Sequence, residues 1–268
     1  MTDLPASSEP LVTREDKDGV AWLTLNSPKK LNALSAATIA AMSETLDAIG
    51  ADTSVRVVVI SGAGGKAFSA GHDLKEMMAH PDQEPCEVLF GACAEMMLKI
   101  HHLPQPVIAK VDGIATAAGC QLVAQCDLAI ASDHSRFATS GINLGLFCAT
   151  PSVPVSRAIG RKATAELLYT GKFLSAEDAE RLGLINRAVG QEVLDAEVEN
   201  LALEIASKSP AAITHGKKLL MNQVEMTLED AYAFAAKTMA CNMQETDTRE
   251  GIQAFIDKQP MPKWKDRP

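Results

Sequence analysis

The sequence predicts an α/β fold, and three observations support that class. Two β-branched runs, residues 55–60 and 107–111, are typical of buried parallel strands, and a loop of small residues follows each. Apolar residues recur at helical spacing between and after these runs. The chain has 268 residues, of which 47% are hydrophobic, so it is long enough to bury one sizeable core.

The first elements are expected to be a hairpin and a helix. Strands over residues 11–15 and 20–25 flank the turn Asp16-Lys17-Asp18-Gly19, which is a hairpin signal. Ser35 is a suitable N-cap for a helix over residues 36–49. Four apolar residues recur at helical spacing in that segment: Ile39, Met42, Leu46 and Ile49.

Strands and helices alternate through the middle of the chain, which gives a repeated β-β-α rhythm. The strand over residues 55–60 leads into the first small-residue loop and a helix over residues 84–100. The strand over residues 107–111 leads into the second loop and a short helix, followed by strand-like residues 127–132 and 136–138.

Helices dominate the rest of the chain. They are predicted near residues 152–159, 162–169 and 175–181, and Ser175 and Gly183 would cap the last of these. Beyond Val193 the chain reads as almost wholly helical. Pro210 begins one helix and another covers residues 228–243. This periodicity indicates amphipathic helices and leaves the oligomeric state open.

Composition narrows the class of protein. A net charge of -9 argues against nonspecific binding to nucleic acid or anionic membranes. Six cysteines lack a CxxC pair or a compact metal-ligand spacing, which predicts a reducing compartment without disulfides or a metal site. Residues 1–10 form a polar tail without a visible targeting signal, so we expect a cytoplasmic protein. No apolar run approaches the roughly 20 residues that span a bilayer.

Two loops of small residues are the best candidates for a functional site. They cover residues 66–73 and 112–121, and each follows a predicted strand, where open α/β sheets bind ligands. Small side chains allow an oxygen to reach backbone N–H groups, which stabilise charge developing on a thioester carbonyl. One such loop alone is more typical of a tight strand-to-helix turn. The pairing of two loops favours a site.

These two loops, followed by residues 137–145 and 251–258, resemble the crotonase (enoyl-CoA hydratase/isomerase) superfamily. The resemblance covers residues 11–264. Within the superfamily, residues 115–122 and 143–148 of this chain are most similar to those of one particular branch.

The resemblance implies an organisation for the whole chain. After the polar tail, residues 11–192 would form a crotonase (ClpP-like) spiral core of β-β-α units. Residues 193–268 would form a C-terminal helical trimerisation region, which implies a homotrimer or a dimer of trimers.

The resemblance also implies a ligand and its site. An acyl-CoA or enoyl-CoA thioester of fatty acyl-CoA metabolism would be the substrate or ligand, with neither a further cofactor nor a metal. The backbone N–H groups of Ser69 and Ala118 would form the oxyanion hole. The residues implied to line the CoA path are Ala67, Ala70, Gly71, His72, Asp73, Phe255 and Lys258, the last two often reaching the CoA of a neighbouring subunit.

Several of these residues have plainer interpretations. Asp73 can be a first-turn carboxylate that the helix dipole favours, and His72 an ordinary partly buried side chain. Lys258 can be a surface lysine one turn beyond Phe255 on an amphipathic helix.

Two positions depart from the pattern of the hydratases in this superfamily. Those enzymes use two glutamates to add water by general acid–base catalysis, and here the same positions are Gln121 and Gly141. A Gln amide can orient water without exchanging a proton near neutral pH, and Gly offers no group at all. The ordinary two-glutamate mechanism therefore has no visible acid or base.

Three hypotheses remain open. Another side chain could transfer the proton, Cys148 being the first candidate if its pKa is lowered. The other nearby candidates are Cys120, Thr139, Ser140 and His72. Alternatively, the space at Gly141 could hold a carboxylate of the substrate or a small anion. The third hypothesis is a non-hydratase acyl-CoA binder or regulator that kept the amide loops.

Overall fold

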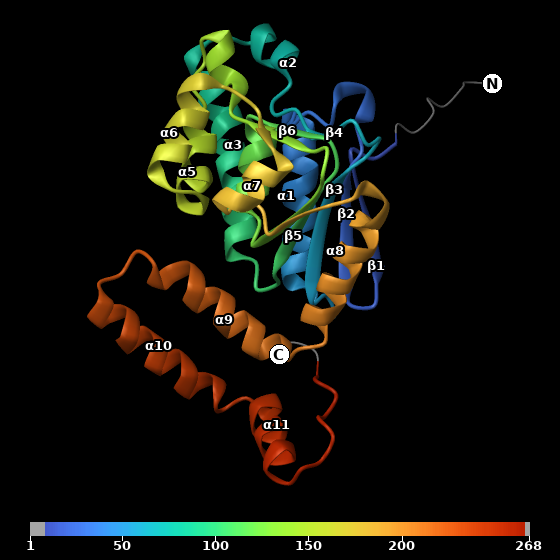
Figure 1. The fold of residues 1–268 in the computed structure, drawn as a ribbon, viewed down its shortest axis with the longest axis vertical. Coiled ribbons are helices and arrows are strands. Elements are labelled where there is room, and N and C mark those ends of the chain that lie inside the picture. Colours follow the sequence, from blue (N-terminus) through green and yellow to red (C-terminus); the bar gives the residue numbers. More distant parts are fainter. Residues whose placement is uncertain (1–8, 266–268) are drawn as a thin grey trace, which may run out of the picture.

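The computed structural model describes residues 9–265 as two β-sheets with helices packed around them (Figure 1). The larger sheet is parallel except for the antiparallel β1–β2 hairpin. Its strands, in spatial order, are β1 (Val12–Lys17), β2 (Val20–Leu25), β3 (Val57–Gly62), β5 (Val107–Val111), β7 (Leu128–Ser132) and β10 (Arg187–Val189). The predicted hairpin is therefore confirmed.

A second, smaller sheet contains the second strand of each repeated β-β-α unit. It contains β4 (Ala67–Ser69), β6 (Ile114–Thr116), β8 (Arg136–Ala138) and β9 (Leu174–Ser175). The chain leaves the larger sheet at the ends of β3, β5 and β7 and adds one short strand to the smaller sheet each time. Strands β4 and β6 lie in segments that the sequence presented as loops. Three residues are too few to show an alternating pattern, so periodicity could not reveal them.

Both faces of the larger sheet are covered, which explains the continuous apolar runs in its strands. On β3, Val58 and Ile60 belong to the core cluster that contains α1 (Ala36–Ala51) and α3 (Gln83–His102). Val57 and Val59 point to the other face and pack with α8 (Gln191–Ala206). Residue 193, where the helical region was predicted to begin, lies inside α8.

Short helices connect the two sheets. The N-caps Ser35 of α1 and Ser175 of α7 accept backbone hydrogen bonds, and Gly183 ends α7 in a left-handed conformation, as the sequence predicts. The connecting helices are η1 (Pro28–Lys30), α2 (Leu74–Ala79), α4 (Ala118–Gln125), η2 (Ser140–Leu144), α5 (Ala149–Ala158), α6 (Arg161–Thr170) and α7 (Ala176–Leu182).

Three helices form a C-terminal arm that lies below the sheets in Figure 1. They are α9 (Pro210–Gln223), α10 (Leu228–Asn242) and α11 (Thr246–Ile256). Pro210 is the first residue of α9, as predicted. Helix α10 has no fully buried residue within this chain, and its apolar side chains Leu228, Tyr232 and Met239 are largely exposed.

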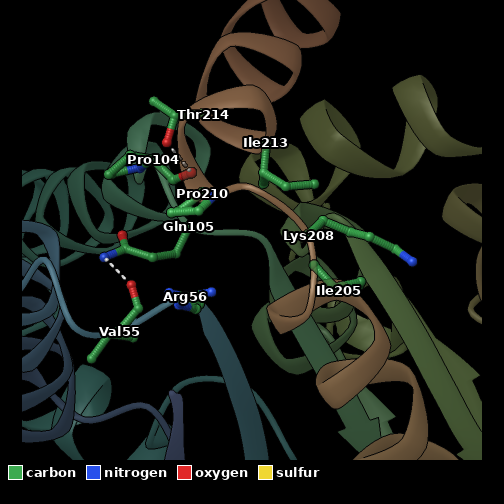
Figure 2. Close-up of a pocket in the computed structure, with 9 residues that line it drawn as sticks. All are labelled: Val55, Arg56, Pro104, Gln105, Ile205, Lys208, Pro210, Ile213 and Thr214. Carbon is green, nitrogen blue, oxygen red and sulfur yellow. Dashed lines mark hydrogen bonds between the residues drawn. The ribbon is translucent and has the colours of Figure 1, made fainter. Parts of the chain in front are cut away.

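The arm is attached to the core through Lys217 of α9. Its ammonium group donates hydrogen bonds to the carbonyl oxygens of Ile100 (3.0 Å) and Gln105 (2.9 Å), and to Asp127 Oδ2 (2.7 Å). Figure 2 shows the neighbouring pocket, where Pro104 of the core accepts a hydrogen bond from Thr214 Oγ1 of α9 (3.4 Å) and Gln105 Nε2 donates to the carbonyl oxygen of Val55 (3.3 Å). The pocket is only about 10 Å³, so the core and the arm meet here almost without a gap.

No helix within residues 9–265 combines the length and apolar character needed to cross a membrane.

Candidate functional site

The two small-residue loops meet at the edge where the larger sheet passes into the smaller one. A Cβ atom placed on Gly119 would lie 2.1 Å from the carbonyl oxygen of Ser69. A Cβ atom on Gly71 would lie 2.9 Å from Ala117 Cβ and 3.0 Å from the backbone nitrogen of Ala118. Only glycines at these two positions permit such close approach, and Gly71 also has a φ of +87°.

Helix α4 begins at Ala118, and its first N–H groups have no acceptor inside the helix. Ala117, the N-cap residue, provides no side-chain hydrogen bond. Its backbone has φ 51° and ψ −120°, an unusual conformation for a residue with a Cβ. Strain of this kind is concentrated at functional sites, and here it turns the N–H of Ala118 toward the first loop.

Asn32 organises the first loop and was not identified from the sequence. Its side chain is buried, donates to the carbonyl oxygens of Ala63 (2.9 Å) and Ala67 (2.8 Å), and accepts from Ser27 N–H (3.0 Å). Ser69 Oγ donates to the Asn32 carbonyl oxygen (2.8 Å). The only signal in the sequence was an Asn in a segment rich in turn-forming residues.

Ala70 is held from the same side. Its N–H donates to the carbonyl oxygen of Leu31 (3.0 Å), so that N–H is committed within the protein. Leu31 and Asn32 both have positive φ angles, 53° and 52°. The loop that carries Ser69 is therefore braced by a tightly bent segment far from it in sequence.

His72 is a neutral, partly buried side chain beside the first loop. Its Nδ1 lies 3.1 Å from the carbonyl oxygen of Leu34, which can only accept, so Nδ1 carries the proton. Nε2 is buried and has no hydrogen-bond partner among the described residues. Burial lowers the pKa of His72 below its usual value, because the imidazolium would lose its solvation. His72 also contacts Phe90 edge-on.

Asp73 caps a helix. Its Oδ1 accepts from the N–H groups of Lys75 (3.0 Å) and Glu76 (3.4 Å) at the start of α2. Its Oδ2 accepts from Lys30 Nζ (2.9 Å), and this bond is the main reason that the pKa of Asp73 is lowered. The geometry favours the plainer interpretation of this carboxylate, that of a helix cap.

Gln121 lies about one turn beyond Ala118 on helix α4. Only 3% of the residue is exposed, and its Oε1 is buried with no hydrogen-bond partner among the described residues. Its backbone N–H donates to the Ala117 carbonyl oxygen (3.0 Å). A buried amide oxygen without a partner is uncommon in folded proteins, which makes Gln121 a candidate site residue.

Gly141 has no space beside it. A Cβ at this position would lie 2.5 Å from the carbonyl oxygen of Leu146 and 2.9 Å from Cys148 Sγ. The position of a Cβ on residue 141 is therefore filled by the protein itself, whereas the hypothesis of a carboxylate or small anion farther from the backbone stays a prediction. The carbonyl group of Leu146 and Sγ of Cys148 occupy that space.

Two thiols adjoin these positions. Burial raises the pKa of Cys120 to about 12, and burial also raises the pKa of Cys148, against a weaker opposing hydrogen bond from Gly141. Both are protonated near pH 7. The lowered pKa that would make Cys148 a base is absent.

Phe255 and Lys258 lie far from the two loops. Phe255 is in the last turn of α11 and Lys258 follows that helix, which lies at the bottom of Figure 1, whereas β4 and β6 are near the top. Phe255 is 75% exposed and Lys258 follows the helix with φ 53°. A single chain therefore does not bring this pair to Ser69 and Ala118.

Within residues 9–265, no group of three or more His, Cys, Asp or Glu side chains is arranged to hold a metal ion. The groups around the loops are instead backbone amides, the neutral imidazole of His72, the Gln121 amide with an unpaired Oε1, and neutral thiols.

Comparison with known proteins identifies the family. The sequence profile described as Enoyl-CoA hydratase/isomerase matches residues 15–267. Enoyl-CoA hydratase domain-containing protein 3, mitochondrial, of Xenopus laevis is 42% identical over 255 residues, which are 95% of this chain and 86% of that protein.

Solved structures agree with the sequence comparison. An enoyl-CoA hydratase of Mycobacterium smegmatis has a TM-score of 0.93 and 53% identity, covering 95% of this chain and 99% of that one. Human enoyl-CoA hydratase domain-containing protein 3 has a TM-score of 0.91 and 39% identity, covering 94% and 99%. The chain therefore belongs to the enoyl-CoA hydratase/isomerase family and has the crotonase fold predicted from its sequence.

Proposed function

We propose that this protein binds acyl-CoA thioesters and holds the thioester oxygen between the backbone N–H groups of Ser69 and Ala118. The observation that supports this most directly is the contact between the two loops, which only Gly71 and Gly119 permit. Preorganised N–H donors of this kind stabilise an enolate-like oxygen, and each is worth roughly 2.7–4 kcal/mol in other enzymes.

The site lacks the side chains that the hydratase reaction of this family uses, since it has no carboxylate at positions 121 and 141. Addition of water to a 2-enoyl-CoA, or migration of its double bond, needs a proton carrier. The closed space at Gly141 and the raised pKa values of Cys120 and Cys148 argue against these positions, which leaves the neutral imidazole of His72, with its unpartnered Nε2, as the remaining candidate base. These observations favour binding without hydration over the two-glutamate hydratase reaction.

We also propose that a second copy of the chain completes the CoA site. The uncovered helix α10 and the remote position of Phe255 and Lys258 support a homotrimer, alone or paired, in which α11 of one copy reaches a neighbour. A lysine is a suitable point-charge partner for a CoA phosphate.

The cellular compartment of this protein is also part of the proposal, with the cytoplasm and the mitochondrion as the two candidates. The sequence predicted the cytoplasm from residues 1–10, of which residues 1–8 lie outside the described part of the chain. The relative from Xenopus laevis is named mitochondrial. Imaging of the native full-length protein with an antibody distinguishes the two compartments.

One experiment tests binding and turnover together. Purified protein is incubated in deuterated water with 2-enoyl- and 3-enoyl-CoA esters of several chain lengths, and the esters are analysed by mass spectrometry. We expect unchanged esters that nevertheless co-elute with the protein on gel filtration. A gain of one water, or deuterium above the control without protein, would show catalysis and contradict binding alone.

Ala118→Val is the matched variant for this experiment. A branched side chain beside the N–H crowds the approach of the thioester oxygen, so retention of the esters should fall by at least about tenfold while the fold persists. Unchanged retention would remove Ala118 from the proposed site.

A further inference from the structure

The chain reverses its direction just after the last helix. The N–H of Gln259 donates to the carbonyl oxygen of Ala254 (2.8 Å), and the N–H of Lys258 donates to that of Phe255 (3.2 Å). Lys258 itself has a φ of 53°. These two bonds around a left-handed residue form a Schellman motif, which ends α11. Residues 259–265 then run back toward the start of α9 (Figure 1).

The residue at the reversal is unusual for its backbone conformation. Glycine is the usual residue at the left-handed position of a Schellman motif, because a Cβ atom is strained there. This chain has Lys258 instead, with its side chain exposed to solvent. Strain that is retained where the side chain adds no packing is typical of a functional position.

Arg56 fastens the returning segment to the core. Its Nη2 donates to the carbonyl oxygens of Trp264 (2.9 Å) and Lys265 (3.3 Å). Its Nη1 donates to the carbonyl oxygen of Ala206, the last residue of α8 (3.1 Å). Arg56 directly precedes β3 and lies in the pocket of Figure 2. One planar guanidinium group therefore joins the C-terminal segment to α8 and to the larger sheet.

The same segment is also fastened to α11. A Cβ atom on Gly251 would lie 2.8 Å from Trp264 Cη2, so the indole packs directly on the backbone of this helix. One turn earlier, Asp247 is only 6% exposed, and its Oδ1 accepts from the N–H of Lys265 (3.4 Å). Its Oδ2 accepts from Ser209 Oγ (2.8 Å), the N-cap of α9. The turn that carries Lys258 is thus held at both of its ends.

We propose that a brace, formed by residues 259–265 and Arg56, positions Lys258 for the phosphates of a CoA bound by a neighbouring copy of the chain. This inference rests on the proposed function, in which Lys258 contacts a CoA phosphate, and adds the residues that set its position. A lysine whose backbone is already fixed loses less conformational freedom when its ammonium group meets the phosphate. Arg56 and Trp264 are positioning residues that act through Lys258.

Calorimetry on the full-length protein tests the brace with two ligands, butyryl-CoA and butyryl-pantetheine, of which only the first carries phosphates. In Arg56→Met, the affinity for butyryl-CoA should fall by about fivefold, because the phosphate contact weakens. The affinity for butyryl-pantetheine should not change. Trp264→Ala leaves the residue before β3 intact and should have the same effect. Equal losses for both ligands would assign Arg56 and Trp264 a merely structural role and overturn the proposal.

A double-mutant cycle shows whether Arg56 acts through Lys258. Lys258→Ala should lower the affinity for butyryl-CoA by about tenfold, and adding Arg56→Met should then have no further effect. Additive effects would overturn the brace. Arg181→Met is the control, because Arg181 forms an exposed ion pair with Asp178 on α7, and it should bind both ligands like the parent.

The same measurements separate the brace from the proposed function. Binding of butyryl-CoA that Lys258→Ala leaves unchanged would overturn the brace while acyl-CoA binding stands. Failure of the parent protein to bind butyryl-CoA would instead reject the proposed function and the brace with it.

Discussion

Asn32 holds the first amide loop in place from outside it. Its side chain joins the carbonyl oxygens of Ala63 and Ala67 to the N–H of Ser27, and its own carbonyl accepts from Ser69. A single buried residue thus fixes the first half of the loop that carries the Ser69 N–H and the segment that precedes it. The position of that N–H depends on this residue more than on the neighbours of Ser69 in sequence.

We expect Asn32→Ala to weaken the fold and the site together. Three buried hydrogen bonds are lost and their partners stay unpaired, so the free energy of unfolding should fall by about 2–3 kcal/mol. Urea denaturation measures this change. Binding of butyryl-CoA to the folded fraction should fall as well. Unchanged affinity would show that the loop keeps its shape without Asn32.

His72 makes stability depend on pH. Its pKa is lowered in the folded protein, so the unfolded chain takes up a proton first as the pH falls. The contribution is complete above the ordinary pKa of about 6.5 and is lost below it, at no more than about 1.4 kcal/mol per pH unit. His72→Asn keeps a donor for the Leu34 carbonyl and cannot titrate.

Thermal unfolding of the two proteins from pH 7.5 to pH 5.5 measures the difference. The parent should lose stability relative to His72→Asn only in the acidic half of this range. Parallel curves would mean that His72 is not held neutral.

At the scale of single residues, the sequence indicated which side chains can exchange a proton, but it did not indicate which residues hold the loops in place. Gln121 and Gly141 were recognised as departures because residue identity alone decides whether a side chain can exchange a proton. Asn32 was missed because its role depends on contacts with residues 63 and 67, which no local pattern reveals. The closure of the space at Gly141 likewise depends on the path of residues 145–148.

Helices and strands were predictable where they are long or carry clear capping and turn residues. The α1 and α7 caps, the β1–β2 hairpin and Pro210 at the start of α9 follow from local rules, and all are confirmed. Strands β4 and β6 are too short to be recognised. They form because the partner strand is supplied by the tertiary fold.

The turn into α4 stores strain that can be measured. Ala117 has φ 51° and ψ −120°, which glycine adopts at little cost. We expect Ala117→Gly to raise the melting temperature by about 2–4 °C, corresponding to about 1 kcal/mol. Calorimetric melting is the measurement. A lower melting temperature would show that the loss of the methyl contact at Gly71 outweighs the relief of strain.

The molecule as a whole consists of a layered core and an arm joined by few contacts. Lys217 and Asp127 form a buried ion pair at the junction, with 6% and 13% of their side chains exposed. The class of this core was predictable from apolar runs covered on both faces. The placement of the arm was not, because the contacts that join it to the core, such as those of Lys217, link residues far apart in the sequence.

Replacing Lys217 by Met should loosen this junction. Asp127 would remain buried without its cation, which costs about 3–5 kcal/mol where it has been measured. Hydrogen exchange should rise across α9 to α11 and remain slow in β3 and β5. Lys218→Met, next to it and exposed, is the control and should exchange like the parent. Equal exchange in both variants would mean that other contacts hold the arm.

The filled space at Gly141 also constrains how this protein could change over time. A Cβ there would overlap the carbonyl oxygen of Leu146, so a glutamate cannot be introduced until the backbone of residues 145–148 has moved. The order of mutations therefore matters, since the loop must be rebuilt first and the carboxylate added second. Single substitutions at position 141 should therefore destabilise the fold until that loop is rebuilt, which places the loop change first in any route to a hydratase.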